Sequence, residues 1–159
     1  MHVLLSERSI KTMNKSEIEK IIPHRDNMLL IDEAYLDENG VGRGKKHITG
    51  DEWFLKGHFP GKPVVPGVIL CEIIAQTACV CLTSDACNDA LPLFTGLNNV
   101  KFKNSVLPGD VFETECEIVK KMLPFIFAKG KGYVNGKLCV QGEFSFAIVK
   151  DKKEHKDAE

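Results

Sequence analysis

The sequence predicts an α+β fold in which one buried helix packs against an antiparallel sheet. From Pro66 to about Leu82 nearly every residue is apolar or small, and a helix that is apolar on all sides is a buried helix. Later in the chain, apolar and polar residues alternate with a period of two, for example from Phe112 to Ile118, which is typical of strands with one solvated face. The chain has 159 residues, 43% of them hydrophobic, and neither a repeat nor a linker divides it, so we expect one core.

The first elements are predicted from capping residues and residue alternation. Ser16 and Glu19 have the spacing of a capping box, which would begin a short helix that ends at Pro23. Strands are expected at residues 28–36 and 41–48.

Both ends of the chain are expected to lie outside the domain. Residues 1–14 lack the basic segment, long apolar core and cleavage pattern of a secretory signal, and residues 150–159 are rich in charge. We therefore expect an N-terminal extension (1–14), a single domain (15–149) and a charged tail (150–159), in a cytoplasmic protein.

Further strands are expected in the second half of the chain, at residues 94–103, 112–118, 125–134 and 138–148. Asn135-Gly136 between two apolar runs indicates a tight type I′ hairpin. In the last strand, alternation places Ser145 on the solvated face with Lys137, Gln141 and Glu143.

The loop before the central helix is predicted to be ordered. Residues 57–67 contain three glycines and three prolines. Each proline fixes its φ angle and each glycine allows φ values closed to other residues, so the segment should form a set of ordered turns. His58 lies in this loop and should be held in place. Alone, it would be interpreted as a loop histidine bonded to the backbone.

The start of the central helix can bind a negatively charged oxygen. Pro66 suits the first turn, and the N–H groups of Gly67, Val68 and Ile69 lack partners within the helix. They lie at the positive end of the helix dipole, so they could stabilise a developing oxyanion.

Glu72 and Gln76 are four residues apart and share one face of this helix. Apolar surroundings favour the neutral, proton-donating form of a carboxylic acid, whereas histidine is a natural base near neutral pH. Alone, Glu72 could equally be a structural hydrogen-bonding acid. With His58 in the adjacent loop, the pair suits the removal of one proton and the delivery of another to the neighbouring atom, as in the elimination of water.

Several motifs here resemble one known family. They are Gly57-His58-Phe59-Pro60-Gly61-Lys62-Pro63, then Pro66-Gly67-Val68, then Glu72 followed by Ala75-Gln76. In order and approximate spacing, Ile22-Pro23-His24-Arg25, Phe102-Lys103 and Pro108-Gly109-Asp110 match as well. From about residue 16 to residue 149 the chain is similar to the β-hydroxyacyl-(acyl carrier protein) dehydratases of bacterial type II fatty acid synthesis.

The resemblance implies a hotdog fold, a curved antiparallel sheet wrapped around a long central helix. It implies catalysis by His58 of one subunit and Glu72 of the other, with the thioester carbonyl bound at the N–H of Gly67. We also expect Val68, Gln76 and Phe59 to bind substrate. The implied partner is an acyl carrier protein that carries a (3R)-hydroxyacyl chain, and the implied assembly is a homodimer, which a hexamer of three dimers would extend.

The chain departs from the family pattern at two places. Ile73 and Ile74 replace the smaller Ala-Met pair that often follows the catalytic acid, and residues 91–94 lack the tyrosine that gates the acyl tunnel in many members. Glu72 favours dehydration alone, because relatives that also isomerise the double bond usually have aspartate there. The alternatives are a dehydratase that also isomerises, a hotdog thioesterase and a non-catalytic acyl-binding subunit.

The remaining features indicate no cofactor, metal or nucleic acid. The net charge is −1, and no Gly-rich phosphate motif follows a strand. Pro66, Glu72 and Gln76 argue against the central helix as a membrane span. His24 could be catalytic, but we interpret it as structural, because the loop that ends the first helix explains it. The cysteines are expected to be reduced, with Cys71 as the one candidate thiol nucleophile; they are Cys71, Cys79, Cys81, Cys87, Cys116 and Cys139.

Local lysines could bind an acidic carrier protein. Lys56 and Lys62 flank the His58 loop, and alternation turns Lys101 and Lys103 away from the core. An ordinary solvated strand face explains the same pattern.

Overall fold

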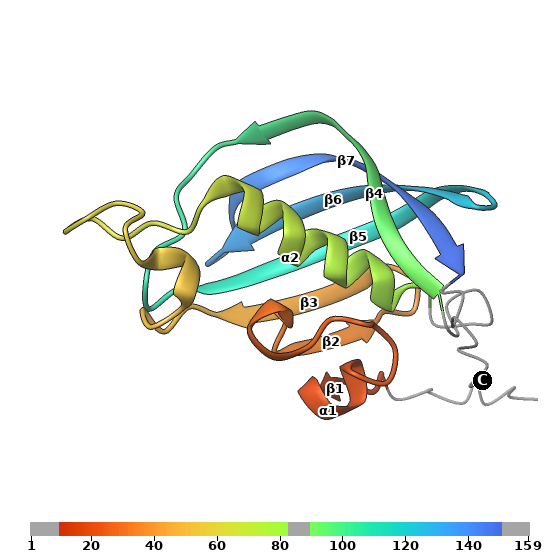
Figure 1. Cartoon of the computed structure of the whole chain (residues 1–159), viewed down its shortest axis with the longest axis horizontal. Helices are drawn as coiled ribbons and strands as arrows, with labels where there is room; N and C mark the ends of the chain where they lie inside the picture. Colours follow the sequence, from red (N-terminus) through yellow and green to blue (C-terminus); the bar gives the residue numbers. More distant parts are fainter. Residues whose placement is uncertain (1–9, 83–89, 151–159) are drawn as a thin grey trace, which may run out of the picture.

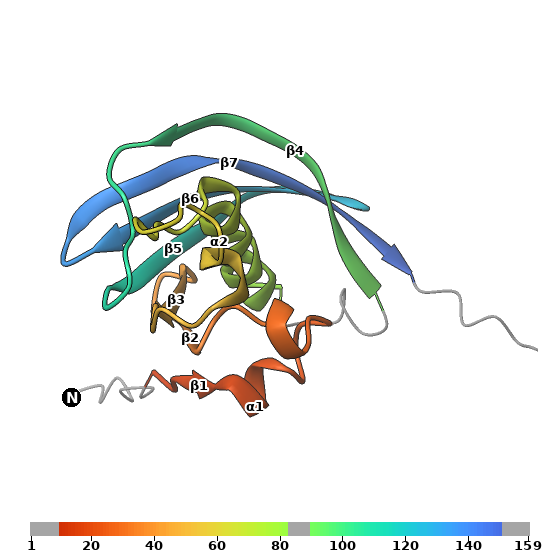
Figure 2. The ribbon, with the colours of Figure 1, turned by 60° about the vertical axis from the view of Figure 1, so that its left-hand side comes forward.

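In the computed structural model, which describes residues 10–82 and 90–150, a curved antiparallel sheet surrounds one helix (Figure 1). Figure 2 shows the sheet curving over this helix, α2. The strand order is β1-β2-β3-β5-β6-β7-β4, and every neighbouring pair is antiparallel. In chain order the elements are β1 (Met13–Asn14), α1 (Lys15–Ile18), the 3₁₀ turn η1 (Asp26–Met28), β2 (Glu33–Leu36), β3 (Gly42–His47), the 3₁₀ turn η2 (Trp53–Leu55), α2 (Gly67–Val80), β4 (Ala90–Phe102), β5 (Val111–Met122), β6 (Phe125–Val134) and β7 (Lys137–Lys150).

The central helix confirms the main prediction from the sequence. Every residue of α2 from Ile73 to Val80 is buried, and the helix packs on β3, β5 and β6. Gly130 on β6 makes this packing possible, because a Cβ atom there would overlap Ile74. The helix and its enclosing sheet confirm the hotdog fold.

The first helix begins two residues earlier than the sequence predicted. The N–H of Glu17 donates to Asn14 Oδ1 over 3.0 Å, and the N–H of Asn14 donates to Glu17 Oε2 over 2.9 Å. The capping box is therefore Asn14 with Glu17, and the prediction of Ser16 with Glu19 was wrong. Asparagine caps helices as well as serine does, so the pattern offered two registers. With the capping box at Asn14 and Glu17, Ile18 is completely buried.

The strand predicted at residues 28–36 is only half formed. Its first residues belong to η1 and to a buried extended segment, and β2 begins at Glu33. The reason is a tertiary contact, because the N–H of Leu30 donates to the side-chain oxygen of Gln76 on α2 instead of to a neighbouring strand.

The strands of the second half are present as predicted, although β4 begins at Ala90 rather than Phe94, and the alternation in β5 and β7 holds with one exception. The β6–β7 hairpin turns at Asn135 and Gly136, whose φ angles of 49° and 75° are both positive, as a type I′ turn requires. The exception is Ser145, which was predicted to be solvated and is only 7% exposed. Strand β4 covers it: Thr95 Oγ1 donates to Ser145 Oγ, and Gly96 has no side chain to block the approach.

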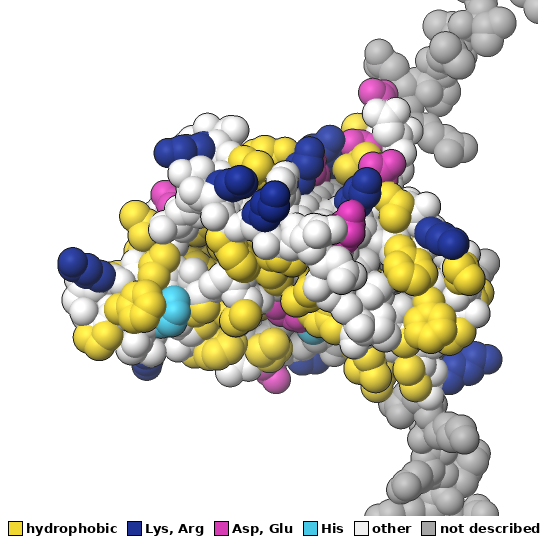
Figure 3. All heavy atoms as spheres, turned by 90° about the horizontal axis from the view of Figure 1, so that it is seen from above, with side chains coloured by type: hydrophobic (Ala, Val, Ile, Leu, Met, Phe, Trp, Pro, Cys, Tyr) yellow, Lys and Arg dark blue, Asp and Glu magenta, His cyan; other side chains and the backbone are white. Residues whose placement is uncertain are grey.

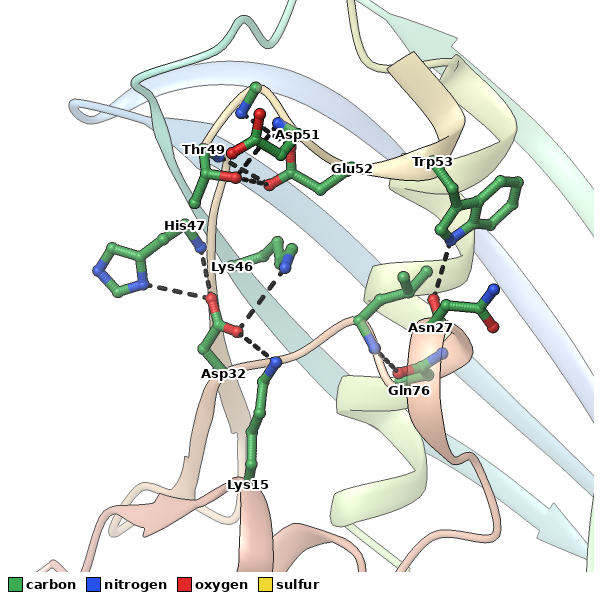
Figure 4. Close-up of polar contacts among 12 residues, drawn as sticks. Lys15, Asn27, Asp32, Lys46, His47, Thr49, Asp51, Glu52, Trp53 and Gln76 are labelled. Atoms are coloured by element: carbon green, nitrogen blue, oxygen red, sulfur yellow. Dashed lines mark hydrogen bonds and ion pairs between the residues drawn. The ribbon is translucent and has the colours of Figure 1, made fainter. Parts of the chain in front are cut away.

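Asp32 ties the first helix to the sheet (Figure 4). Its carboxylate lies 3.1 Å from Lys15 Nζ and 3.7 Å from the nearly buried Lys46 Nζ, and it accepts the N–H of His47 over 2.7 Å. Burial opposes ionisation, but the His47 hydrogen bond and the two lysines outweigh it, so the pKa of Asp32 is lowered.

Asp32→Asn is therefore expected to lower the free energy of unfolding by about 2 kcal/mol near neutral pH, because Lys46 loses its carboxylate. A lowered folded pKa gives stability that is complete above the unfolded pKa, about 3.9, and is lost as pH falls through the folded pKa. Urea unfolding should show the difference near neutral pH and a smaller one at low pH.

The matched control is Glu113→Gln, which removes the solvent-exposed ion pair with Lys45. Its effect should stay below about 1 kcal/mol. If Asp32→Asn lowered stability equally at both pH values, the charge of Asp32 would not be the cause.

Candidate active site

The loop that holds His58 is ordered by its own backbone. The N–H of Val64 donates to the carbonyl of His58 over 3.1 Å, and Phe59 and Lys62 exchange two backbone hydrogen bonds. Gly57 and Gly61 have φ angles of 79° and 75°, which only glycine adopts easily.

The ring of His58 is oriented by one hydrogen bond. Nδ1 lies 2.9 Å from the carbonyl oxygen of Val64, and a carbonyl only accepts, so Nδ1 carries the hydrogen. In the neutral ring, Nε2 is then the basic atom, and nothing in the described part of the chain is hydrogen-bonded to it. The ring also stacks on Phe59, with centroids 4.2 Å apart.

His58 borders an open pocket of about 560 Å³ that reaches the N-terminus of α2. Gly67, Val68 and Phe102 line it as well. Among the described residues, the N–H groups of Gly67 and Val68 have no acceptor, whereas that of Ile69 donates to Pro66, contrary to the prediction. A Cβ atom on Gly67 would lie 2.8 Å from the ring of Phe102, so glycine is needed for this aromatic wall.

Glu72 lies on the second turn of α2 among polar partners. Its side chain is 20% exposed, so most of its surface is covered, as the sequence suggested. Gln76 Nε2 donates to Glu72 Oε1 over 3.0 Å, and His24 Nε2 lies 3.3 Å from the same oxygen. The pair Glu72 and Gln76 thus share a helix face as predicted.

Gln76 is fully buried and joins α2 to the segment after His24. Its side-chain oxygen accepts from Leu30 over 2.9 Å (Figure 4), and its nitrogen donates to the carbonyl of Met28 over 2.8 Å. The remaining hydrogen reaches Glu72. Gln76 therefore contacts Glu72 and does not line the His58 pocket.

The structure forms two groups from the predicted site residues. His58, Gly67 and Val68 lie around one pocket, and Glu72 is not part of its lining. Glu72 instead lies with Gln76 and His24. In the described part of the chain, Glu72 therefore does not line the pocket that His58 borders.

Large apolar side chains are exposed around the pocket and along β4. Phe59, Val68 and Phe102 are 57%, 72% and 54% exposed. Figure 3 shows the molecule from above, with hydrophobic side chains spread over the surface and Lys or Arg side chains beside them. Strand β4 is the edge of the described sheet, so its outer hydrogen-bonding groups face no neighbouring strand there.

Two residues were missed as members of the site. Phe102 was noted only as part of a motif, and His24 was assigned a structural role. The motifs marked both positions, but neither the contact of Phe102 with Gly67 nor that of His24 with Glu72 follows from spacing in the sequence.

The thiol chemistry considered for Cys71 has no support in its surroundings. Burial raises the pKa of the Cys71 thiol, which disfavours the reactive thiolate. Burial raises the pKa of Cys81 to about 11. Cys71, Cys81, Cys116 and Cys139 are in no disulfide, and Cys87 lies outside the described residues. Within residues 10–82 and 90–150, no group of three or more histidine, cysteine or acidic residues could hold a metal ion.

The curved sheet, the enclosed helix and the histidine loop define a protein of the hotdog fold. Residues 22–143 match the FabA-like domain family, and the chain belongs to this family.

A 3-hydroxyacyl-[acyl-carrier-protein] dehydratase FabZ from Clostridium beijerinckii is 42% identical over 140 residues, which cover 86% of this chain and 99% of that protein. A protein of the same name from Alkaliphilus metalliredigens is 40% identical over 141 residues, covering 86% of this chain and 95% of that protein.

Solved structures agree on the fold. The dehydratase heterocomplex ApeI:P from Xenorhabdus doucetiae matches with a TM-score of 0.72 at 18% identity, covering 84% of this chain and 91% of that chain. An uncharacterized protein from Pyrococcus horikoshii matches with a TM-score of 0.59 at 17% identity, covering 80% of this chain and 88% of that chain. No helix in the described part of this chain is long and apolar enough to cross a membrane.

Proposed function

We propose that the chain removes water from (3R)-3-hydroxyacyl groups carried by an acyl carrier protein and forms the trans-2-enoyl thioester, in the fatty acid biosynthesis of the cytoplasm. The observation that carries this proposal is His58: among the described residues its Nε2 has no partner, and it borders a pocket that ends at the N–H of Gly67, which has no acceptor among those residues either. Dehydratases similar over most of the chain support the reaction and its substrate.

In the proposed reaction, the N–H of Gly67 binds the thioester carbonyl. His58 Nε2 removes the proton from the α-carbon, and negative charge moves onto the carbonyl oxygen. The N-terminus of α2 stabilises this charge through the N–H of Gly67 and the helix dipole. Phe59 and Val68 supply apolar surface for the substrate beside the pocket.

The acid of the reaction is proposed to be Glu72 of a partner subunit. Glu72 is absent from the lining of the His58 pocket in its own chain, and exposed apolar side chains surround that pocket. Pairing of two β4 edges would cover such surface and continue the sheet. We therefore propose a homodimer with shared sites, and a hexamer of three dimers as its further assembly.

An assay of the product tests the reaction. Purified protein is incubated with 3-hydroxyacyl carrier proteins of different chain lengths, and the product is identified by mass and by the position of the double bond. Loss of one water with a new double bond at carbon 2 supports the proposal. A double bond at carbon 3 adds isomerisation, whereas release of the free thiol without change at carbon 3 would replace dehydration by thioester hydrolysis.

Lysines beside the pocket are proposed to bind the acidic carrier protein. Lys103 lines the His58 pocket, and Lys101, Lys62 and Lys56 are exposed. Lys101→Glu/Lys103→Glu should slow turnover of the carrier-bound substrate by about tenfold at low salt and less as salt screens the charges. Turnover of the same acyl group on a small thiol should not change.

The matched control is Lys129→Glu/Lys131→Glu, which makes the same charge change at exposed positions on β6. These lysines do not line the His58 pocket. Equal rates for parent and Lys101→Glu/Lys103→Glu on carrier-bound substrate at low salt would place the carrier elsewhere.

A further inference from the structure

The carboxyl group of Glu72 is held asymmetrically. Gln76 Nε2 and His24 Nε2 approach the same oxygen, Oε1, at 3.0 Å and 3.3 Å. Among the described residues, Oε2 has no hydrogen-bond partner. The two oxygens of the candidate acid are therefore not equivalent.

Both groups that approach Oε1 are themselves fixed. Arg25 Nη1 donates to the carbonyls of Ile22 and His24, over 2.7 Å and 2.8 Å, and so clamps the backbone that carries the His24 ring. Gln76 is bonded to the backbone of Met28 and Leu30. The nitrogen of His24, from the loop, and that of Gln76, from α2, are therefore both held close to Glu72 Oε1.

The surroundings of the His24 ring indicate which nitrogen carries the hydrogen. Nδ1 is buried and has no partner in the part of the chain that the structure describes. A hydrogen on Nδ1 would be a buried donor without an acceptor, which is costly, whereas a hydrogen on Nε2 points at Glu72. The contacts therefore suit a neutral ring with its hydrogen on Nε2. Such a ring adds no positive charge that would hold Glu72 as a carboxylate.

We infer that His24 is a positioning residue which, with Gln76, fixes Glu72 Oε1 as the hydrogen-bond acceptor and leaves Oε2 to carry the proton that is delivered to substrate. This inference rests on the proposed dehydration. In that step the Oε2–H bond breaks and its proton joins the β-hydroxyl. The C–O bond breaks with its electron pair on the departing water, and the electrons of the α C–H bond form the double bond. Two donors on Oε1 then stabilise the carboxylate that remains.

The test compares three replacements of His24. Gln carries its side-chain N–H at nearly the reach of histidine Nε2, whereas Asn is one bond shorter and Ala has no donor. We expect His24→Ala and His24→Asn to lower kcat by about 10- to 100-fold with KM within about threefold, since proton delivery is impaired and binding is not. His24→Gln should restore kcat to within about fivefold of the parent. Because His24→Asn keeps a polar side chain and leaves a smaller void than alanine, it tests the inference even where His24→Ala does not fold.

Trp53→Phe is the matched control for a loosened loop. Trp53 Nε1 donates to the carbonyl of Asn27 and anchors the same segment (Figure 4). The hydrogen bonds of Glu72 among the described residues are with Gln76 and His24, not with Trp53. Its kcat should stay close to that of the parent, with folding of every variant followed by thermal unfolding.

The outcomes separate the inference from the function on which it rests. A parent that dehydrates no 3-hydroxyacyl carrier contradicts the proposed function. A parent that dehydrates, with folded His24→Asn within twofold of its kcat, contradicts the role of His24 alone. The role of His24 is also contradicted if His24→Gln loses as much kcat as His24→Asn. It is contradicted as well if Trp53→Phe loses as much kcat as the His24 variants.

Discussion

Replacement of His58 by alanine is expected to lower kcat for dehydration by about 10²- to 10⁴-fold, the usual contribution of a positioned base. The protein should remain folded, because the half-buried ring makes one hydrogen bond, to Val64, and one stacking contact, with Phe59. Loss of these contacts should cost about 1 kcal/mol of unfolding free energy. The measurements are steady-state turnover of a 3-hydroxyacyl carrier protein and urea unfolding of both proteins.

A second replacement separates the base from the loop that holds it. Asn at position 58 places an N–H close to the position of histidine Nδ1, so the hydrogen bond to Val64 can persist while the basic Nε2 is lost. His58→Asn should therefore be as inactive as His58→Ala. His47→Ala, at an exposed histidine on β3, is the control and should keep parental turnover. If His58→Asn retained turnover within about threefold, His58 would act by shaping the loop and another group would be the base.

The parts of the site that could be predicted from sequence are those that local chemistry determines. Glycines and prolines around His58 restrict the backbone whatever packs on it, and the loop is ordered as expected. An apolar run that begins at Pro66 has one stable environment, the inside of the sheet. Asn135 and Gly136 both adopt positive φ angles readily, so they determine a type I′ turn without help from distant residues.

The parts that could not be predicted depend on contacts between distant residues. The segment after Met28 has the composition of a strand, but the amide of Gln76 binds its backbone from α2 and replaces strand pairing. The same amide brings His24 and Glu72 to one place, although 48 positions separate them in the sequence. The contact between His24 and Glu72 depends on the buried side chain of Gln76, so the spacing of His24 and Glu72 in the sequence could not predict it.

Glu72→Gln is expected to lower kcat by at least about 10²-fold with little change in KM, because an amide has the shape of the acid but cannot deliver its proton. Glutamine has the same shape as the acid, and its amide oxygen can accept the hydrogen bonds that Gln76 and His24 make to Glu72, so folding should persist. A kcat within about threefold of the parent would assign Glu72 a structural role and require another acid.

Mixing Glu72→Gln with His58→Ala tests whether the two groups act from different subunits. Each variant alone is expected to be inactive. If the site is shared, a mixed dimer contains one site with both groups intact and one with both lost, whereas a site built within one chain is never intact in any dimer. Random exchange makes about half of the dimers mixed, so roughly a quarter of parental activity should return. A mixture of His58→Ala with His58→Asn is the matched control, since no pairing of these chains restores the base. Exchange is followed with differently tagged chains, and a complete exchange that restored no activity would mean that His58 and Glu72 do not meet across a dimer.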